Sequence, residues 1–141
     1  GPGKEEKFDL IVLDLTDPLG PAAELYSPRF MAECKALLNE GGMFVLHIGP
    51  PVYAPQRVSG LMKNLTSVFH IVAPYFVYIP LYGSLWGMAC ASDTRDPRQT
   101  NKARVDEIIR ERSLPNLQYY NGATHEAGFA LPEYLKKILS S

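Results

Sequence analysis

Hydrophobic residues at the start of the chain follow the spacing first of a strand and then of a helix. The run over 8–14 is nearly continuous, contains branched residues and ends on an acid, which predicts a buried strand of a parallel sheet. Ser27 and Pro28 are typical of the first residues of a helix, and apolar residues follow them at helical spacing. Gly41 and Gly42 predict the end of this helix, because glycine readily adopts the backbone conformation that closes one.

The next segments repeat this order of strand and helix. A short apolar run over 43–48 predicts a second strand, and the proline-rich stretch over 49–55 predicts a loop. Apolar residues then recur over 56–69 at the spacing of one helical face. The first half of the chain is therefore predicted to be strand, helix, strand, helix.

After position 70 the hydrophobic pattern changes. Residues 71–80 and 85–92 are rich in aromatic and branched side chains and flank a short turn, which predicts two adjacent antiparallel strands. The sheet is therefore expected to be mixed. A solvent-facing helix is predicted over 102–112, where charges alternate around aliphatic residues, and a short closing helix over 131–139.

Composition narrows the class of protein. The 141 residues, 46% hydrophobic and 21% charged, have the balance of one globular domain. A formal net charge of -1 provides no general basic surface for nucleic acid, and no apolar run approaches the length of a membrane span. Residues 1–7 lack the core of a signal peptide. Cys34 and Cys90 lie in apolar contexts and are expected to be buried reduced thiols, which fits a cytoplasmic protein.

The first predicted strand begins very near the first residue. Strands of a parallel sheet usually have neighbours on both sides, so we expect an exposed sheet edge or a partner beside 8–14. Residues 1–141 are accordingly interpreted as a single, partial domain of a longer protein.

Two acids three residues apart give the densest chemical signal. Asp14 and Asp17 follow the first strand and enter a turn stiffened by Pro18 and Pro21. The carboxyl end of a strand is where parallel sheets bind ligands, and two converging carboxylates suit a cationic amine: one accepts a proton while the other holds the charge. The same spacing also fits an N-capping acid followed by a turn-forming Asp-Pro, and spacing alone does not separate the two interpretations.

Aromatic residues around the second turn give another signal. Tyr78, Tyr82 and Trp86 could surround an alkyl-ammonium group through cation–π contact, although ordinary core packing explains the same composition. The histidines at 47, 70 and 125 and the two cysteines show no metal-ligand spacing, so no metal site is expected.

Three segments together resemble the polyamine aminopropyltransferases, the spermidine synthase family, and they span nearly the whole chain. FDLIVLDLTDPLGPAAELYSPRF looks like the strand and D-x-[ST]-D-P-x-G-P-A loop of that family. YIPLYGSLWGMACAS and LQYYNGATHEAGFALPEYL look like its substrate-side turn and its terminal signature. The resemblance implies an α/β fold: the carboxyl-terminal half of a Rossmann-like, class I methyltransferase-like domain, with parallel strands followed by an antiparallel pair.

The resemblance also implies a reaction and roles for residues. The reaction is transfer of an aminopropyl group from decarboxylated S-adenosylmethionine, as co-substrate, to a polyamine, either putrescine or spermidine, with no prosthetic group. Asp14 corresponds to the base, which also borders the donor, and Asp17 to the acid that holds the amine. The other matching positions are the donor-binding Pro21 and Ala22 and the amine-binding Tyr82 and Trp86.

The chain also departs from the family. The glycine-rich nucleoside loop, the acids that bind ribose and adenine, and the amino-terminal β-domain are not in this sequence, so this chain alone is expected to be inactive. Where spermidine synthases often have a glutamine, residues 46–51 read LHIGPP, and the turn between Tyr82 and Trp86 is one residue short. Both features are closer to thermospermine synthase-like members.

Two other functions stay open at this point. An S-adenosylmethionine-dependent methyltransferase would share the fold, and a non-catalytic domain could pair with a complete subunit or with itself through the edge beside 8–14. Homo-oligomers are common in the family, so self-association is expected under either the enzymatic or the non-enzymatic interpretation.

Overall fold

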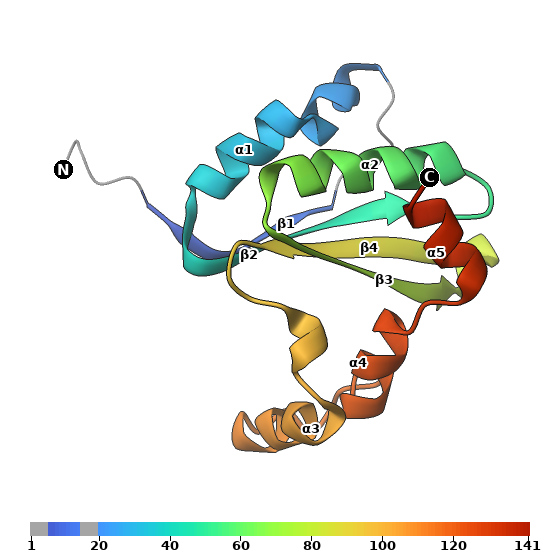
Figure 1. Ribbon diagram of the computed structural model, residues 1–141. Helices are drawn as coiled ribbons and strands as arrows, with labels where there is room; N and C mark the ends of the chain where they lie inside the picture. Colours follow the sequence, from blue (N-terminus) through green and yellow to red (C-terminus); the bar gives the residue numbers. More distant parts are fainter. Residues whose placement is uncertain (1–5, 15–19) are drawn as a thin grey trace.

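The computed structural model describes residues 6–14 and 20–141, which form a mixed four-stranded sheet with helices on both faces (Figure 1). The strand order is β1-β2-β4-β3; β1 and β2 are parallel, while β4 is antiparallel to both of its neighbours. The strands are β1 (Phe8–Leu13), β2 (Leu38–Gly49), β3 (Ile71–Ile79) and β4 (Ser84–Ser92). The predicted mixed sheet, with parallel strands followed by an antiparallel pair, is confirmed.

Two helices cover one face of the sheet and enclose the core. α1 (Pro28–Ala36) and α2 (Pro55–Val68) lie above the sheet in Figure 1, and α5 (Glu133–Leu139) packs against α2. Phe44, Leu46 and Ile48 of β2 point into this core and are at most 1% exposed. Met31 of α1 and Leu65 of α2 meet them from above, both fully buried. The alternation along β2 therefore sends its other side chains to the opposite face.

The opposite face is covered at the β3 side by two helices that follow β4. α3 (Lys102–Glu111) and α4 (Gly122–Phe129) pack on each other, and α4 contacts β3 below the sheet in Figure 1. The α3 helix was predicted, but α4 was not. Its start has a reciprocal capping box, in which the Asn121 side chain accepts from the Thr124 amide and the Thr124 hydroxyl accepts from the Asn121 amide.

The β1 strand forms an edge of the sheet. Among the described residues it pairs only with β2, and Phe8, Leu10 and Val12 are 44%, 55% and 59% exposed. The prediction of a buried strand is therefore wrong for most of β1: Leu13 is buried, and Ile11 is half buried against the core. The prediction of an exposed sheet edge is confirmed for the part of the chain that the structure describes.

Gly41 and Gly42 do not end the first helix. α1 ends at Ala36, and the two glycines lie in β2, where the register with β1 shifts. Gly41 has a φ of 74°, and a Cβ on Gly42 would lie 2.9 Å from the Asn39 carbonyl oxygen. The glycine pair thus permits an irregularity at the start of β2 and is a strand feature.

The other predicted elements agree with the structure apart from their ends. The helix predicted over 56–69 is α2, and the closing helix predicted over 131–139 begins later, at Glu133. A 3-10 helix, η1 (Gly20–Tyr26), lies between β1 and α1. Among the described residues, no helix is both long and apolar enough to cross a membrane.

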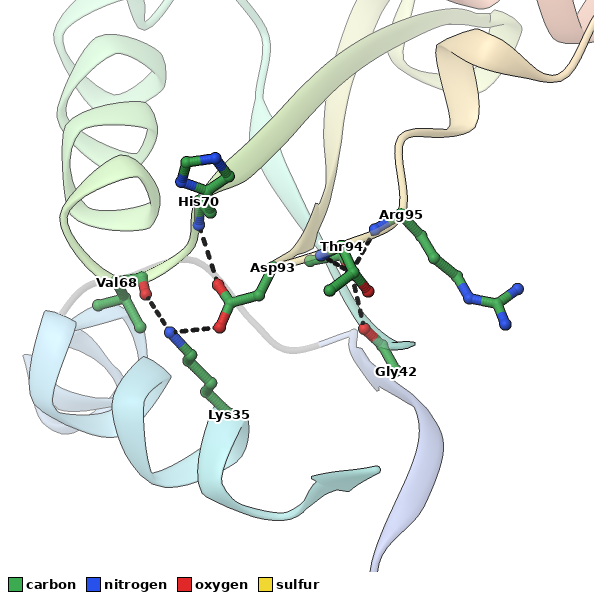
Figure 2. A network of polar contacts seen from close by, with 8 residues as sticks. Lys35, Gly42, Val68, His70, Asp93, Thr94 and Arg95 are labelled. Atoms are coloured by element: carbon green, nitrogen blue, oxygen red, sulfur yellow. Dashed lines mark hydrogen bonds and ion pairs between the residues drawn. The ribbon is translucent and has the colours of Figure 1, made fainter. Parts of the chain in front are cut away.

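Polar contacts tie α1, α2, β3 and β4 together at the end of the sheet away from Leu13 (Figure 2). The Lys35 ammonium donates to the Val68 carbonyl and pairs with the Asp93 carboxylate, both at 2.8 Å. Asp93 also accepts from the His70 amide at 3.0 Å. The hydrogen bond from Lys35 is the largest cause of a lowered pKa for Asp93. The charged carboxylate is therefore the form that the folded protein favours.

Ser92, the last residue of β4, extends this connection to β2. Its hydroxyl donates to the Gly42 carbonyl at 3.0 Å, and the side chain is fully buried. The Arg95 amide donates back to the same hydroxyl oxygen at 3.1 Å, which turns the chain away from the sheet. Ser92 and Asp93 thus connect the end of β4 to β2, to the residue before β3 and to α1.

We predict that Gly122→Ala destabilises the protein by about 2 kcal/mol, because its new Cβ would overlap the Lys102 carbonyl oxygen where α4 meets α3. Gly60→Ala, in the interior of α2 with open space around its Cβ, is the matched control and should stabilise by about 0.5–1 kcal/mol. The free energy of unfolding of both variants, measured in urea, tests this prediction. Equal effects would show that the α3–α4 contact is not tight.

We also predict that Asp93→Asn lowers the stability at pH 7 by about 1 kcal/mol. Because folding lowers the pKa of Asp93, its stabilising effect is present above the ordinary pKa of aspartate, about 4, and is lost as the pH falls through the folded-state value. The difference from wild type should thus be largest at neutral pH and smaller at about pH 2–3. Urea unfolding of both proteins across this pH range measures the difference in stability. Glu40→Gln, which removes an exposed carboxylate, is the control. If the effect of Asp93→Asn does not change with pH, the stabilising role of the Asp93 carboxylate is contradicted.

Candidate active site

Asp14 follows directly after β1, at the carboxyl end of the parallel pair. Leu13 pairs with Leu46, and both side chains belong to the core under α1 and α2. The next residues, Asp14 and His47, are therefore level with each other on the opposite face of the sheet. Asp14 is exposed, as a carboxylate that meets a ligand must be. The predicted position of this acid at a strand end is confirmed.

Trp86 extends the same row onto β4. His47 pairs with Met88, two residues from Trp86, so the imidazole and the indole share one face. Their ring centroids are 6.2 Å apart with the planes inclined by 22°, which is a stacked arrangement. Asp14 directly after β1, His47 of β2 and Trp86 of β4 thus form one row, in which Trp86 lies two residues beyond the level of His47.

Tyr82 comes to Trp86 from the turn between β3 and β4. The short helix η2 (Pro80–Tyr82) ends on Gly83, whose φ of 59° is the left-handed conformation that lets the chain reverse. The rings of Tyr82 and Trp86 are 4.8 Å apart at an angle of 46°. Tyr82 and Trp86, two of the three residues predicted to surround an amine, are therefore in contact, and Tyr82 is 55% exposed. Tyr78, the third, is exposed on β3, opposite Leu85.

Tyr26 orients His47. The Tyr26 hydroxyl lies 3.0 Å from His47 Nε2, and the two rings meet edge to face at 6.0 Å. Tyr26 is 3% exposed at the end of η1, and its carbonyl accepts from the Asn64 side chain of α2 at 3.0 Å. The imidazole is thus held between a buried phenol and the indole. The sequence interpretation considered His47 only as a possible metal ligand and a departure from the family pattern.

Arg57 was also not predicted. It lies in the first turn of α2, half buried, with its guanidinium carbon 5.9 Å from the Trp86 ring centroid. The space it occupies depends on Gly49, whose φ is 104° and whose Cβ, if present, would lie 3.0 Å from Arg57 Nε. A cation therefore already lies over the indole. Arg57 comes just after the proline-rich loop, and the sequence pattern there predicted a loop but no functional residue.

The remaining predicted residues are on or near η1. Ala22 is half buried in this helix, and Pro21 lies beside it. Both precede Tyr26 in the segment between β1 and α1. Asp17 lies outside the described residues. The structure does not test the donor-binding and amine-binding roles of these three positions.

A separate cavity of about 380 Å³ lies under α4 on the same face of the sheet. Burial raises the pKa of Cys90 in its wall to about 11 and that of Tyr75 to about 12, so both side chains are protonated at neutral pH. Cys34 and Cys90 are free thiols, as predicted; Cys34 is buried in the core as expected, whereas Cys90 is only half buried. Over residues 6–14 and 20–141, no three histidine, cysteine, aspartate or glutamate residues group as metal ligands would.

The chain is similar to known proteins of one family. A family model described as "Spermine/spermidine synthase domain" matches residues 3–103. The chain is 43% identical over 136 residues to a polyamine aminopropyltransferase of Nitrosomonas europaea, and 41% identical over 136 residues to polyamine aminopropyltransferase 2 of Hyperthermus butylicus. These matches cover 96% and 95% of this chain but only 42% and 45% of the two relatives.

Solved structures give the same result. A spermidine synthase in complex with the transition state analogue AdoDATO has a TM-score of 0.85 and 31% identity, and the spermidine synthase of Thermotoga maritima has a TM-score of 0.80 and 30% identity. The matches cover 96% of this chain and 46% and 45% of those chains. The fold is thus the predicted methyltransferase-like α/β fold, and the chain spans less than half the length of its relatives. The matching family model covers well over half of this chain, which therefore belongs to the spermine/spermidine synthase domain family.

Proposed function

We propose that the full-length protein containing this chain transfers an aminopropyl group from decarboxylated S-adenosylmethionine to a polyamine and releases 5′-methylthioadenosine. The observation that carries this proposal is the row of Asp14, His47 and Trp86 on one face at the carboxyl end of the sheet. A carboxylate beside aromatic rings suits an alkyl ammonium group. The family of the chain supports the same reaction.

Asp14 acts as the general base in this proposal. An alkyl amine is mostly protonated at neutral pH and then has no lone pair to donate. The Asp14 carboxylate takes the amine proton, and the free nitrogen attacks the carbon beside the sulfonium. A nitrogen–carbon bond forms as the carbon–sulfur bond breaks, and its electron pair leaves on sulfur as a neutral thioether. The carboxylate also orients the nitrogen toward the carbon, which lowers the entropic part of the barrier.

The aromatic residues hold the rest of the acceptor. Tyr82 and Trp86 provide ring surface along the methylene chain, and Tyr26 keeps His47 in one orientation. We assign Asp17 the role of holding an ammonium group of the acceptor, from its place three residues after Asp14. The acceptor class is an aliphatic polyamine, putrescine or spermidine.

The donor needs residues beyond this chain. Pro21 and Ala22 would line the adenine site from η1, while the relatives are more than twice as long as the matched region. The open half of the sheet face beside Leu10 and Val12 adjoins Asp14, and the rest of the protein would cover it. We therefore propose that the chain alone is inactive.

The exposed edge of β1 also favours association. Leu10 and Val12 expose more than half of their surface on a strand that, over residues 6–14 and 20–141, has a neighbour on one side only, which favours pairing with another segment. We propose that the full-length protein is a cytoplasmic homo-oligomer. If the full-length protein forms oligomers without any methylthioadenosine production, a non-catalytic self-associating role replaces the enzymatic one.

We predict that Asp14→Asn in the full-length protein lowers kcat by about 10²- to 10⁴-fold, because the amide cannot accept the amine proton. The melting temperature should stay the same, since Asp14 is exposed after the strand end. Asp9→Asn is the matched control on the same strand; the Asp9 carboxylate accepts from Asn39 at 2.9 Å, and an amide oxygen can still do so. A chromatographic assay of methylthioadenosine and product amine measures both. Equal turnover by the two variants would remove Asp14 from the base role.

A further inference from the structure

The cavity of about 380 Å³ under α4 lies apart from the residues of the proposed reaction. Tyr75 and Val77 of β3 and Cys90 of β4 form its wall on the sheet side, and α4 lies across from them (Figure 1). Sites for small molecules in proteins are concave, mostly apolar and of at least about 300 Å³. The cavity therefore has room for a compact organic molecule.

The side of α4 that lines the cavity carries small residues. Thr124 and Gly128 lie one helical turn apart, and both line it. A Cβ on Gly128 would lie 3.8 Å from Tyr75 Cβ, which is an ordinary contact, and the Gly128 backbone is not left-handed. Neither packing nor backbone conformation therefore requires glycine here, although glycine stabilises a helix less than alanine does. The missing side chain leaves space in the cavity.

Aromatic rings form much of the remaining wall. The ring centroids of Tyr75 and Phe129 are 5.4 Å apart, and those of Phe129 and His125 are 5.2 Å apart. Tyr120 meets His125 edge to face at 5.9 Å. Rings at these distances offer both faces and edges to a further ring, which favours a flat aromatic molecule.

The wall offers no negative charge to a polyamine. Among the described residues that line the cavity, none is acidic. Burial raises the pKa of Cys90 to about 11 and that of Tyr75 to about 12, so the thiol and the phenol stay protonated. A cation in the cavity would lose its hydration without gaining a counter-charge.

His125 is already engaged within the protein. Its Nε2 lies 2.8 Å from the Pro97 carbonyl oxygen. A carbonyl oxygen only accepts, so Nε2 carries a proton and donates it. Its Nδ1 lies 2.8 Å from the Tyr120 hydroxyl. Both ring nitrogens thus have protein partners, and the imidazole contributes its ring surface to the cavity.

We propose that the cavity under α4 binds a small, flat, uncharged aromatic molecule and excludes polyamines. The aromatic wall supplies the contact surface, and the space at Gly128 admits the ligand. Its chemistry is thus opposite to that beside Asp14, where a carboxylate suits an ammonium group. Binding in this cavity does not depend on the aminopropyl transfer proposed above.

The test uses the full-length protein and indole, a two-ring aromatic molecule that is uncharged at neutral pH. Calorimetric titration should show saturable binding of indole, and excess putrescine should not displace it. Bound indole should also slow the reaction of Cys90 with an uncharged pyridyl disulfide, because Cys90 is in the wall. Mass spectrometry of the peptide that contains Cys90 measures this reaction.

A glycine substitution in α4 locates the bound indole. Gly128→Leu places a side chain in the cavity and should weaken indole binding at least about tenfold. Gly60→Leu, on α2 with open space around its Cβ, is the matched control and should bind indole as wild type does.

Three results would overturn the proposal. They are no binding of indole, displacement of indole by putrescine, and equal affinity of Gly128→Leu and Gly60→Leu for indole. If Gly128→Leu does not fold, Cys90 decides: protection by indole supports the site, and an unchanged reaction rate overturns it. Production of methylthioadenosine is measured separately, so failure of this site is distinguishable from failure of the proposed reaction.

Discussion

The absence of a side chain at Gly87 is the constraint on which the rest of the site depends. A Cβ at this position would lie 2.7 Å from Phe76 Cε1 and 2.8 Å from Ile48 Cγ1. Because these contacts are too close, β4 can lie between β2 and β3 only if residue 87 is glycine. With Gly87 against the core, alternation sends Trp86 to the opposite face, where His47 stacks on it. The parallel register of β1 and β2 then brings Asp14 to the same end of the sheet as His47.

The two faces of the sheet have different roles. The face under α1 and α2 contains the packed core, and at its far end Lys35 and Asp93 join helices to strands. The other face is covered by α4 only at the β3 side, which leaves Leu10 and Val12 exposed next to Asp14. The packed core therefore lies on one face of the sheet, and the candidate catalytic residue Asp14 lies on the other. In the function proposed above, the rest of the full-length protein would cover the open part of that face.

Much of the fold follows from local patterns in the sequence. The four strands, α2 and α3 were predicted because their apolar residues recur at regular spacing. The helix α4 was missed because its capping box lies among tyrosines and glycines without such spacing. Gly41 and Gly42 were assigned to a helix end, although the register shift that they permit is set by a strand far away in sequence. Asp14 was found because an acid at a strand end is a local signal.

The contacts that define the site could not be predicted in the same way. Tyr26 and His47, or Arg57 and Trp86, meet only after the register of β2 and β4 is set, so no local pattern reveals them. The most direct test of the central claim is a crystal structure of the full-length protein with putrescine and methylthioadenosine. The arrangement described above predicts an amine nitrogen about 2.7–3.2 Å from the Asp14 carboxylate, with the carbon chain crossing His47 toward Trp86. Putrescine bound in the cavity under α4, with Asp14 facing only solvent, would contradict it.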